Sequence, residues 1–368
     1  MITACWMPTP LLAFDLWPEF QSVIDSKKIS EVEDKISSEY SSDVLTFSLP
    51  LSSPYMFAQN PNRFELGMGS LSGKEFFIQQ KLALKKELAP RFYFDFRWWD
   101  HGDYDQESSQ YLWGLSYKVT SQFSFGLLGS AYHRKDRNDF GAEARYQIMS
   151  HSSVALIYFL PDFQKNKRTR ETSRWGEAPQ IITLKYQSIT AHFFEAYLKW
   201  EPEYSEKFTD RTDRYSAERM QAGLIYDRGD SFRGQFQFQQ KSENENSVER
   251  DSTFSQLRLE TKDFFTPRNI TLGWAQYFRK FEGLTEGSRE YYDFLPYAWY
   301  QPSKWAFGFD VNQQVKSNQK DETEGRINLK YEEKFQDSAA LSFYFTFDAD
   351  SLSSQPWEGG GAHFYALF

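Results

Sequence analysis

The sequence is poor in cysteine, in long apolar runs and in positive charge. Its 368 residues include a single cysteine, Cys5, which excludes a disulfide framework and a cysteine-based metal site. No stretch approaches the roughly 18 consecutive apolar residues of a spanning helix, so a helical membrane protein is excluded. The net charge of -9 offers no basic surface, so nucleic acid is not an expected partner.

Aromatic residues are abundant instead. The chain contains 11 Trp, 22 Tyr and 35 Phe, which make 18% of it, whereas all hydrophobic residues together make only 40%. Aromatic side chains therefore replace aliphatic ones rather than adding to them. With 25% charged residues and a mean hydropathy of -0.67, these rings stand among strongly polar neighbours.

The first 62 residues differ in pattern from the rest. The apolar run that ends in Pro10-Leu11-Leu12-Ala13 indicates that residues 1–13 are the remnant of a signal peptide, although no basic residue precedes it. An ordinary N-terminus is the alternative. The residues before Cys5 match the pattern of a lipid-modified cysteine, but too few precede it for an export signal.

Residues 14–62 are expected to form a separate N-terminal segment. Ile29, Val32, Ile36 and Tyr40 fall on one face at helical spacing, with charges between them. This pattern predicts one short amphipathic helix. The segment is expected either to lie in the periplasm or to form a plug inside the barrel that is predicted below from residues 63–368.

After residue 63 the side chains alternate with a period of two. Between Ser338 and Asp348, for example, apolar Phe343 and Phe345 alternate with Ser342, Tyr344 and Thr346. The same alternation recurs in 91–99, 232–239, 304–314 and 325–332. Because successive strand residues point to opposite faces, each segment predicts a strand with one apolar and one polar face.

Turn signals divide this region regularly. Tight turns, such as those at Ala89-Pro90 and Pro302-Ser303, alternate with longer polar connections, such as Asp162 to Ala178 and Ser242 to Ser252. The spacing predicts about eighteen antiparallel strands, joined by short turns at one end and longer loops at the other. An open sheet of that size would leave two unpaired edges, whereas a closed barrel leaves none.

The predicted fold is therefore all-β: a single closed antiparallel transmembrane β-barrel spanning residues 63–368. Its outer face would be apolar, and lipid is the solvent that suits such a face. A soluble β-sandwich is the alternative, since it would pack the aromatic faces against each other. The asymmetry between short and long connections favours the barrel.

The end of the chain carries the most specific motif. Ala362, Phe364, Ala366 and Phe368 share one face of the last predicted strand, and the final residue is aromatic. This strand resembles the closing strand of Gram-negative outer-membrane barrels. The resemblance implies a location in the cell outer membrane, termini in the periplasm, and a signal at Phe364, Ala366 and Phe368 that the barrel-assembly machinery reads. More weakly, the chain resembles eighteen-stranded substrate-specific and polysaccharide-export porins.

The alternation also predicts which charges point inward. The inward bases are Lys81, Arg91, Arg97, Lys118, Arg145, Lys185, Lys199, Arg219, Arg233, Arg258, Arg279, Arg326 and Lys330. The inward acids are Asp95, Glu143, Glu195, Glu260, Asp310 and Glu332. An excess of bases along a pore favours anions. The alternative is that these arginines pair with acids across the sheet.

The sequence contains little evidence for a catalytic site. His151-Ser152-Ser153 has the spacing of a His-x-Ser pair but lies in a predicted turn without an acid or amide partner. Asp100, His101, Asp103 and Asp105 resemble a protease rim cluster, but the second carboxylate pair that a protease needs is not identifiable. Asp100, Asp103 and Asp105 could instead bind Ca²⁺, although a solvated loop is the simpler interpretation. No catalytic residue, metal or cofactor is therefore expected.

The sequence predicts a channel for polar, anionic solutes or polysaccharide, set in outer-membrane lipid. The alternative is a non-conducting barrel, with a filled lumen, that acts as a scaffold or assembly partner or binds ligands at the cell surface.

Overall fold

The computed structural model describes most of the chain from residue 62 onward. The described residues are 62–70, 77–102, 107–132, 138–160, 174–176, 180–208, 214–228, 231–262, 269–283, 287–317, 321–335, 338–354 and 356–368. The predicted signal-peptide remnant and the predicted helix lie outside this part. Among the described residues, no helix is long and apolar enough to cross a membrane.

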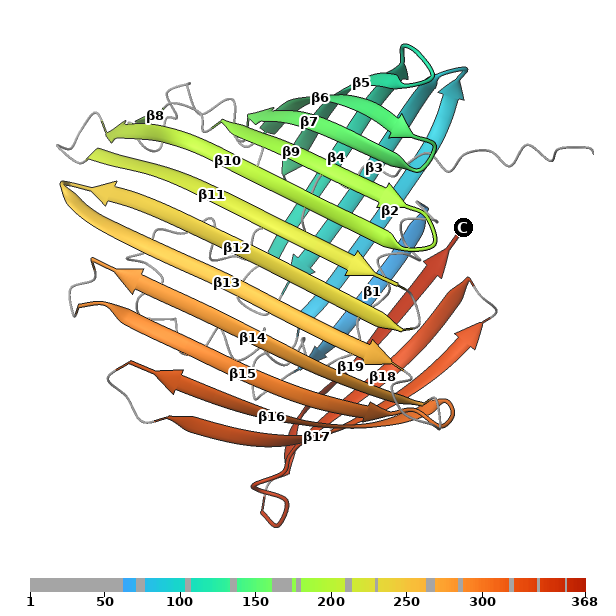
Figure 1. The fold of residues 1–368 in the computed structure, drawn as a ribbon, viewed down its shortest axis with the longest axis vertical. Helices are drawn as coiled ribbons and strands as arrows, with labels where there is room; N and C mark the ends of the chain where they lie inside the picture. The colour runs from blue at the N-terminus through green and yellow to red at the C-terminus, as the bar shows by residue number, and fades with distance from the viewer. Residues whose placement is uncertain are drawn as a thin grey trace, which may run out of the picture.

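Every regular element of the described part is a β-strand (Figure 1). The first ten are β1 (Arg63–Ser70), β2 (Phe77–Ala89), β3 (Phe92–Gly102), β4 (Glu107–Lys118), β5 (Phe123–Tyr132), β6 (Asn138–Met149), β7 (Ser152–Leu160), β8 (Arg174–Gly176), β9 (Ile181–Ile189) and β10 (Phe193–Phe208). The others are β11 (Arg214–Asp227), β12 (Phe232–Glu245), β13 (Val248–Lys262), β14 (Ile270–Glu282), β15 (Arg289–Tyr300), β16 (Trp305–Lys316), β17 (Glu322–Phe335), β18 (Ala339–Asp348) and β19 (Trp357–Leu367).

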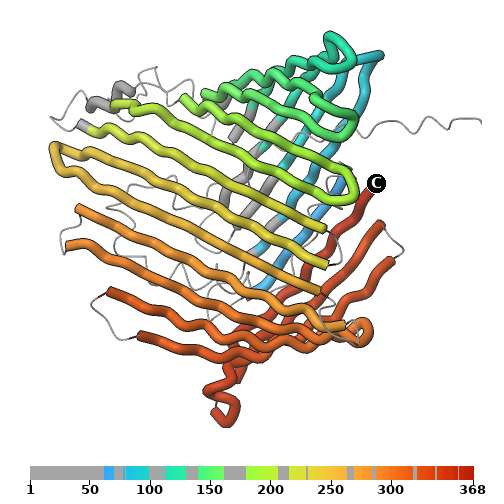
Figure 2. Tube along the Cα trace, in the orientation of Figure 1, coloured from blue at the N-terminus to red at the C-terminus, as the bar shows by residue number. Residues whose placement is uncertain are grey.

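The sheet closes on itself. Apart from the short β8, which pairs with β10, each strand pairs antiparallel with the strands next to it in the chain, and β7 pairs directly with β9. The barrel closes at β1, which pairs with both β2 and β19, the latter from Arg63↔Leu367 to Ser70↔Gly360. Figure 2 shows the first strand, in blue, beside the last, in red. The short β8 and the longer β9 both pair with β10 and share one position, so the described strands form a closed barrel of 18 strands. The predicted closed all-β barrel is confirmed.

The two faces of the sheet differ as the alternation predicts. In β16, Trp305, Phe307 and Phe309 are exposed, whereas the alternating residues Ala306, Gly308 and Asp310 are buried. In a closed barrel, the face that the surrounding wall shields from solvent is the inner one. The buried residues of each strand therefore face the inside, and the exposed residues form the outer surface.

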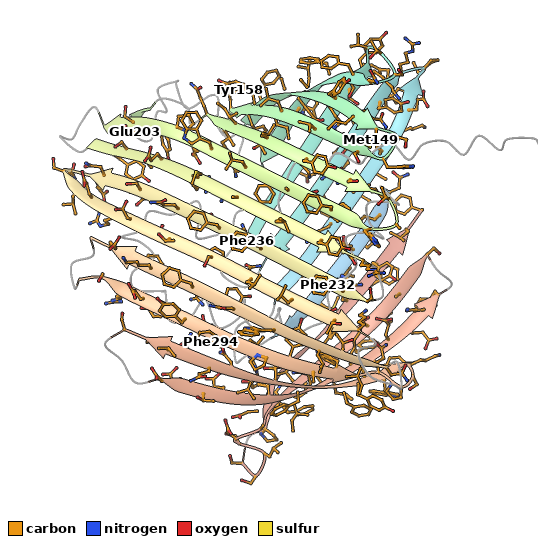
Figure 3. The ribbon with its side chains drawn as sticks, in the orientation of Figure 1. Met149, Tyr158, Glu203, Phe232, Phe236 and Phe294 are labelled. Atoms are coloured by element: carbon orange, nitrogen blue, oxygen red, sulfur yellow. The ribbon has the colours of Figure 1, made fainter. Side chains whose placement is uncertain are left out.

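The outer surface is strongly apolar and aromatic. Phe232 and Phe236 lie along it on β12, Phe294 lies on β15, and Tyr158 lies on β7 (Figure 3). Phe236 is 41% exposed and Tyr158 is 40% exposed. Comparable exposure recurs around the barrel, at Trp113, Leu127, Leu156, Leu184, Trp200, Leu224, Trp274, Phe309 and Phe343. Such a surface would aggregate in water, because it far exceeds the apolar patches of soluble monomers.

The end of the barrel that carries the short turns also carries the C-terminus. The Leu367 N–H donates to the Ser338 carbonyl in the turn between β17 and β18, and the Phe368 N–H donates to the Asn62 carbonyl. The opposite end carries the longer connections. This separation of short and long connections agrees with the sequence-based expectation.

One predicted long connection is wrong. The run from Ser242 to Ser252 continues β12 and β13, which are joined by Asn246 and Ser247. Both have positive φ, 54° and 70°, as a tight hairpin turn of matching twist requires. The strands β10 to β13 are consequently among the longest in the barrel, and their loop-side ends carry polar residues on the outer face.

Candidate functional site: the inner wall of the barrel

The charged residues expected to point inward lie mostly on the buried face. Arg219, Arg258, Arg279 and Arg326 are at most 6% exposed, and Glu143, Glu260 and Asp310 at most 3%. Arg97, Arg145, Arg233 and Asp95 lie on the same face and are half-buried. Arg91 does not: it is exposed in the turn between β2 and β3 with a φ of 69°. Whether the others line a path for solutes stays a prediction.

These side chains are joined across the strands. Arg326 lies directly opposite Asp310, and its Nε donates to Asp310 Oδ1 at 2.8 Å. Asn328 Nδ2 donates to the other Asp310 oxygen, and Thr346 Oγ1 donates to Asn328 Oδ1 at 2.9 Å. One network thus crosses β16, β17 and β18. Lys185 of β9 likewise pairs with Glu195 of β10 at 2.9 Å, whereas Arg145 pairs at 2.7 Å with Glu143 on its own strand, β6.

Four fully buried inward acids are missing from the set predicted from the sequence: Glu201, Asp227, Glu243 and Asp293. Glu201 accepts from Arg219 Nη2 at 2.6 Å, and Asp227 accepts from Arg233 Nε at 3.3 Å. Glu243 pairs with Lys241, and Asp293 pairs with Arg279. Glu201, Asp227 and Glu243 lie in or beside segments predicted as connections. Asp293 lies two residues from both Tyr291 and Leu295, so the period-two alternation of β15 could have identified it as an inward residue.

The fully buried charges of the wall balance. The buried acids are eight: Glu143, Glu195, Glu201, Asp227, Glu243, Glu260, Asp293 and Asp310. The buried bases are also eight: Lys185, Lys199, Arg219, Lys241, Arg258, Arg279, Arg326 and Lys330. The large excess of inward bases expected from the sequence is therefore absent from this buried layer, and cross-strand pairing dominates it.

Several inward aromatic rings lie flat against the wall. A Cβ added to Gly273 would overlap the ring of Tyr297, and one added to Gly308 would overlap Trp299. Glycine is needed at these positions because the neighbouring ring occupies the space of a side chain. The Tyr297 hydroxyl accepts from Arg258 Nε and donates to Glu260 Oε2, both at 3.0 Å. The rings thus cover the wall and its ion pairs.

One sector of the inner face is apolar. The side chains of Ala275, Tyr277, Leu295, Tyr297, Trp299 and Ala306 form one cluster on β14, β15 and β16, and Phe254 packs against it. Ala275 and Leu295 are 0% exposed. A smaller apolar contact joins Leu128 and Ile157 elsewhere on the buried face. Apolar sectors thus alternate with the ionic parts of the lining.

The candidates for catalysis are not assembled in the described part. His151 is exposed in its turn, Ser153 faces inward at 2% exposure, and the Ser152 hydroxyl is hydrogen-bonded to the Ser188 hydroxyl at 2.9 Å. The side chains of Asp100 and His101, and the whole of Asp103 and Asp105, lie outside the described part. Within that part, no group of three His, Cys, Asp or Glu residues is placed to hold a metal.

Phe364 and Ala366 of the C-terminal motif lie on the outer face of β19, and Phe368 directly follows this strand. Phe364 and Phe64 of β1 approach with ring centroids 6.5 Å apart, and Phe368 is 65% exposed. Ala366 lies on the same face, opposite Phe64. Their role as an assembly signal stays a prediction.

No family model matches the chain. No curated protein matches it either. Among solved structures, a loop-deletion variant of OmpT from Vibrio cholerae is similar at 8% identity, over 83% of this chain and 97% of that one, with a TM-score of 0.43.

Two further solved structures are similar to the same degree. An anion-selective porin from Comamonas acidovorans shares 11% identity over 83% of this chain and 98% of that one, with a TM-score of 0.40. OprD from Pseudomonas aeruginosa shares 9% identity over 84% and 95%, with a TM-score of 0.41. At these values the similarities carry no argument about the function of this chain.

Proposed function

We propose that the chain is an outer-membrane channel that passes polar solutes. The contrast between its two faces supports this most directly. The outer face exposes aromatic and aliphatic side chains, for which lipid is the suitable surrounding, whereas the inner face carries ionised pairs. A barrel of 18 strands is wider than wall side chains alone can fill, so it leaves room for an aqueous path.

Orientation and assembly follow from the same proposal. The termini would face the periplasm, because the short turns gather at the end that carries Leu367 and Phe368. Phe364, Ala366 and Phe368 would be read by the barrel-assembly machinery during insertion. Their position on the outer face of the last strand leaves them accessible to such a partner.

We expect a modest preference for anions. The buried charges cancel, but the half-buried inward residues include Lys81, Arg97, Arg145 and Arg233, against Glu65, Asp95 and Glu332. A small positive excess along a narrow water column attracts anions weakly. Anionic polysaccharide is the finer hypothesis, since flat tyrosine rings beside arginines suit sugar rings with acidic groups.

Proteoliposome swelling tests the channel and its preference together. Vesicles containing the purified barrel should swell in an isosmotic neutral monosaccharide, faster in a small organic anion, and slowest in an organic cation of equal size. Vesicles without protein are the control. Faster entry of the cation would overturn the anion preference. Absence of swelling in all three solutes would overturn the channel.

A non-conducting scaffold or surface-binding barrel is the second candidate. The apolar inner cluster around Ala275 and Leu295 favours it, because a fully water-filled lumen would wet such side chains. In this case residues 14–62 would fill the lumen as a plug. Swelling would then be absent in the intact protein and would appear after deletion of residues 14–61.

A further inference from the structure

Gln276 is a polar residue in the middle of the apolar outer face. It stands between Trp274 and Phe278 on β14, and Trp274 is 51% exposed. Its chain neighbours Ala275 and Tyr277 face inward, at 0% and 3% exposure, so the Gln276 side chain belongs to the outer surface. In the ladder it lies between Leu257 of β13 and Phe294 of β15.

The amide of Gln276 hydrogen-bonds to none of the described residues. It offers two N–H donors and an oxygen with two lone pairs. Lipid tails satisfy neither kind of group, so an amide at this depth is strongly unfavourable if only lipid surrounds it. Lys280 and Glu282, the next outward polar residues of β14, pair with each other at 2.7 Å near the loop-side end.

A second polar defect lies on the neighbouring strand. The β15–β16 ladder includes Phe294↔Gln313 and resumes at Tyr297↔Asp310, so Leu295 and Pro296 pair with no residue of β16. The register is the same on both sides, which excludes a bulge. Pro296, which has no N–H to donate, is exposed on the outer face and lies opposite Trp274. An interrupted ladder facing lipid is costly for the same reason as the amide.

We infer that the surface formed by Trp274, Gln276, Phe278, Phe294 and Pro296, here the Gln276 face, binds a second copy of this chain. Two copies related by a twofold axis present the same amide to each other, and an amide is both donor and acceptor. Each Gln276 then satisfies the other. Lipid headgroups cannot take this role, because they lie at the membrane surface and Gln276 lies between apolar neighbours along its strand.

The rest of the Gln276 face suits such an interface. Trp274, Phe278 and Phe294 surround the amide with large rings, the side chains that commonly anchor protein interfaces. Directly behind it, on the inner side of the same strands, lies the apolar cluster of Ala275, Leu295 and Trp299. A packed inner cluster makes the barrel wall more rigid at the place where the second copy would bind.

Cysteine cross-linking in outer membranes tests this contact. The variant Gln276→Cys, in a Cys5→Ser background, should form under mild oxidation a disulfide-linked species of twice the 43.4 kDa chain mass. The matched control is Leu184→Cys, an outward mid-strand residue of β9 that is 50% exposed. It should remain monomeric. Equal cross-linking of the two cysteines, or none at Gln276→Cys, overturns the inference.

The second measurement uses the mass of the protein in mild detergent. The unmodified protein should be a dimer by light scattering, and Gln276→Leu should be a folded monomer, with folding checked by heat-modifiable electrophoretic mobility. A monomeric unmodified protein, or a dimer that survives Gln276→Leu, contradicts the Gln276 face. Neither result depends on conductance, so this test is separate from that of the proposed channel.

Discussion

Replacing Asp310 by alanine is expected to lower the free energy of unfolding by about 3–5 kcal/mol. Asp310 is 0% exposed, and its carboxylate accepts hydrogen bonds from Arg326 and Asn328. Without it, the guanidinium of Arg326, 2% exposed, stays buried without its opposite charge. Equilibrium unfolding in urea, with the protein in lipid vesicles, measures the change.

The matched control is an ion pair outside the wall. Lys304, in the turn between β15 and β16, donates to both oxygens of Glu333 at 2.7 Å, and this hydrogen bond raises the pKa of Lys304 above its ordinary value. The pair is therefore charged at neutral pH, but it is exposed to solvent, where such pairs contribute little. Lys304→Ala should leave the unfolding curve unchanged. Equal losses of unfolding free energy in the two variants would show that burial does not determine how much a wall pair contributes to stability.

Phe343→Arg is expected to cost about 2–4 kcal/mol of stability, and Tyr344→Arg much less. Phe343 points outward from the middle of β18 and is 37% exposed, so an arginine there would enter the lipid layer. Tyr344 points inward, where the Lys330 ammonium lies 5.7 Å from its ring centroid and Glu332 is close to Lys330. The same urea titration compares the two variants. A similar loss in both would contradict the assignment of outer and inner faces.

The barrel itself could be predicted from sequence because its signals are local. Alternation of period two, as in Leu341 to Phe347, follows from the geometry of a single strand lying between two different surroundings. Turn residues mark where each strand ends. Closure of the sheet follows from the strand number, because an open sheet of eighteen antiparallel strands with an apolar face would leave two unpaired edge strands, which is unfavourable.

The balance of acidic and basic residues on the inner wall was harder to predict than the barrel itself. Beyond the apolar band, both faces of a strand are polar, so the period-two pattern disappears and Glu243 reads as part of a loop. Glu201 precedes a break in the β10–β11 register between Glu201 and Tyr204, which also hides its face. Partners of a given arginine depend on cross-strand register, and register is a property of two strands rather than of one.

The Gln276 face shows the same limit. A glutamine between Trp274 and Phe278 looks, in sequence, like an irregularity of the outer pattern. Its significance appears only when the ladder places it one strand from the gap at Pro296. The flat position of Tyr297 over Gly273 is likewise a cross-strand relation that no local pattern contains.

The most direct test of the central claim, a water-filled path inside a barrel with a charge-balanced wall, is a planar-bilayer recording of the purified protein across a KCl gradient. We predict stepwise conductance with a reversal potential displaced slightly toward that of chloride. The displacement should shrink as salt rises, because the screening length falls from about 10 Å at 0.1 M to about 3 Å at 1 M. Absence of conductance steps would contradict the claim, and so would strong selectivity for either ion.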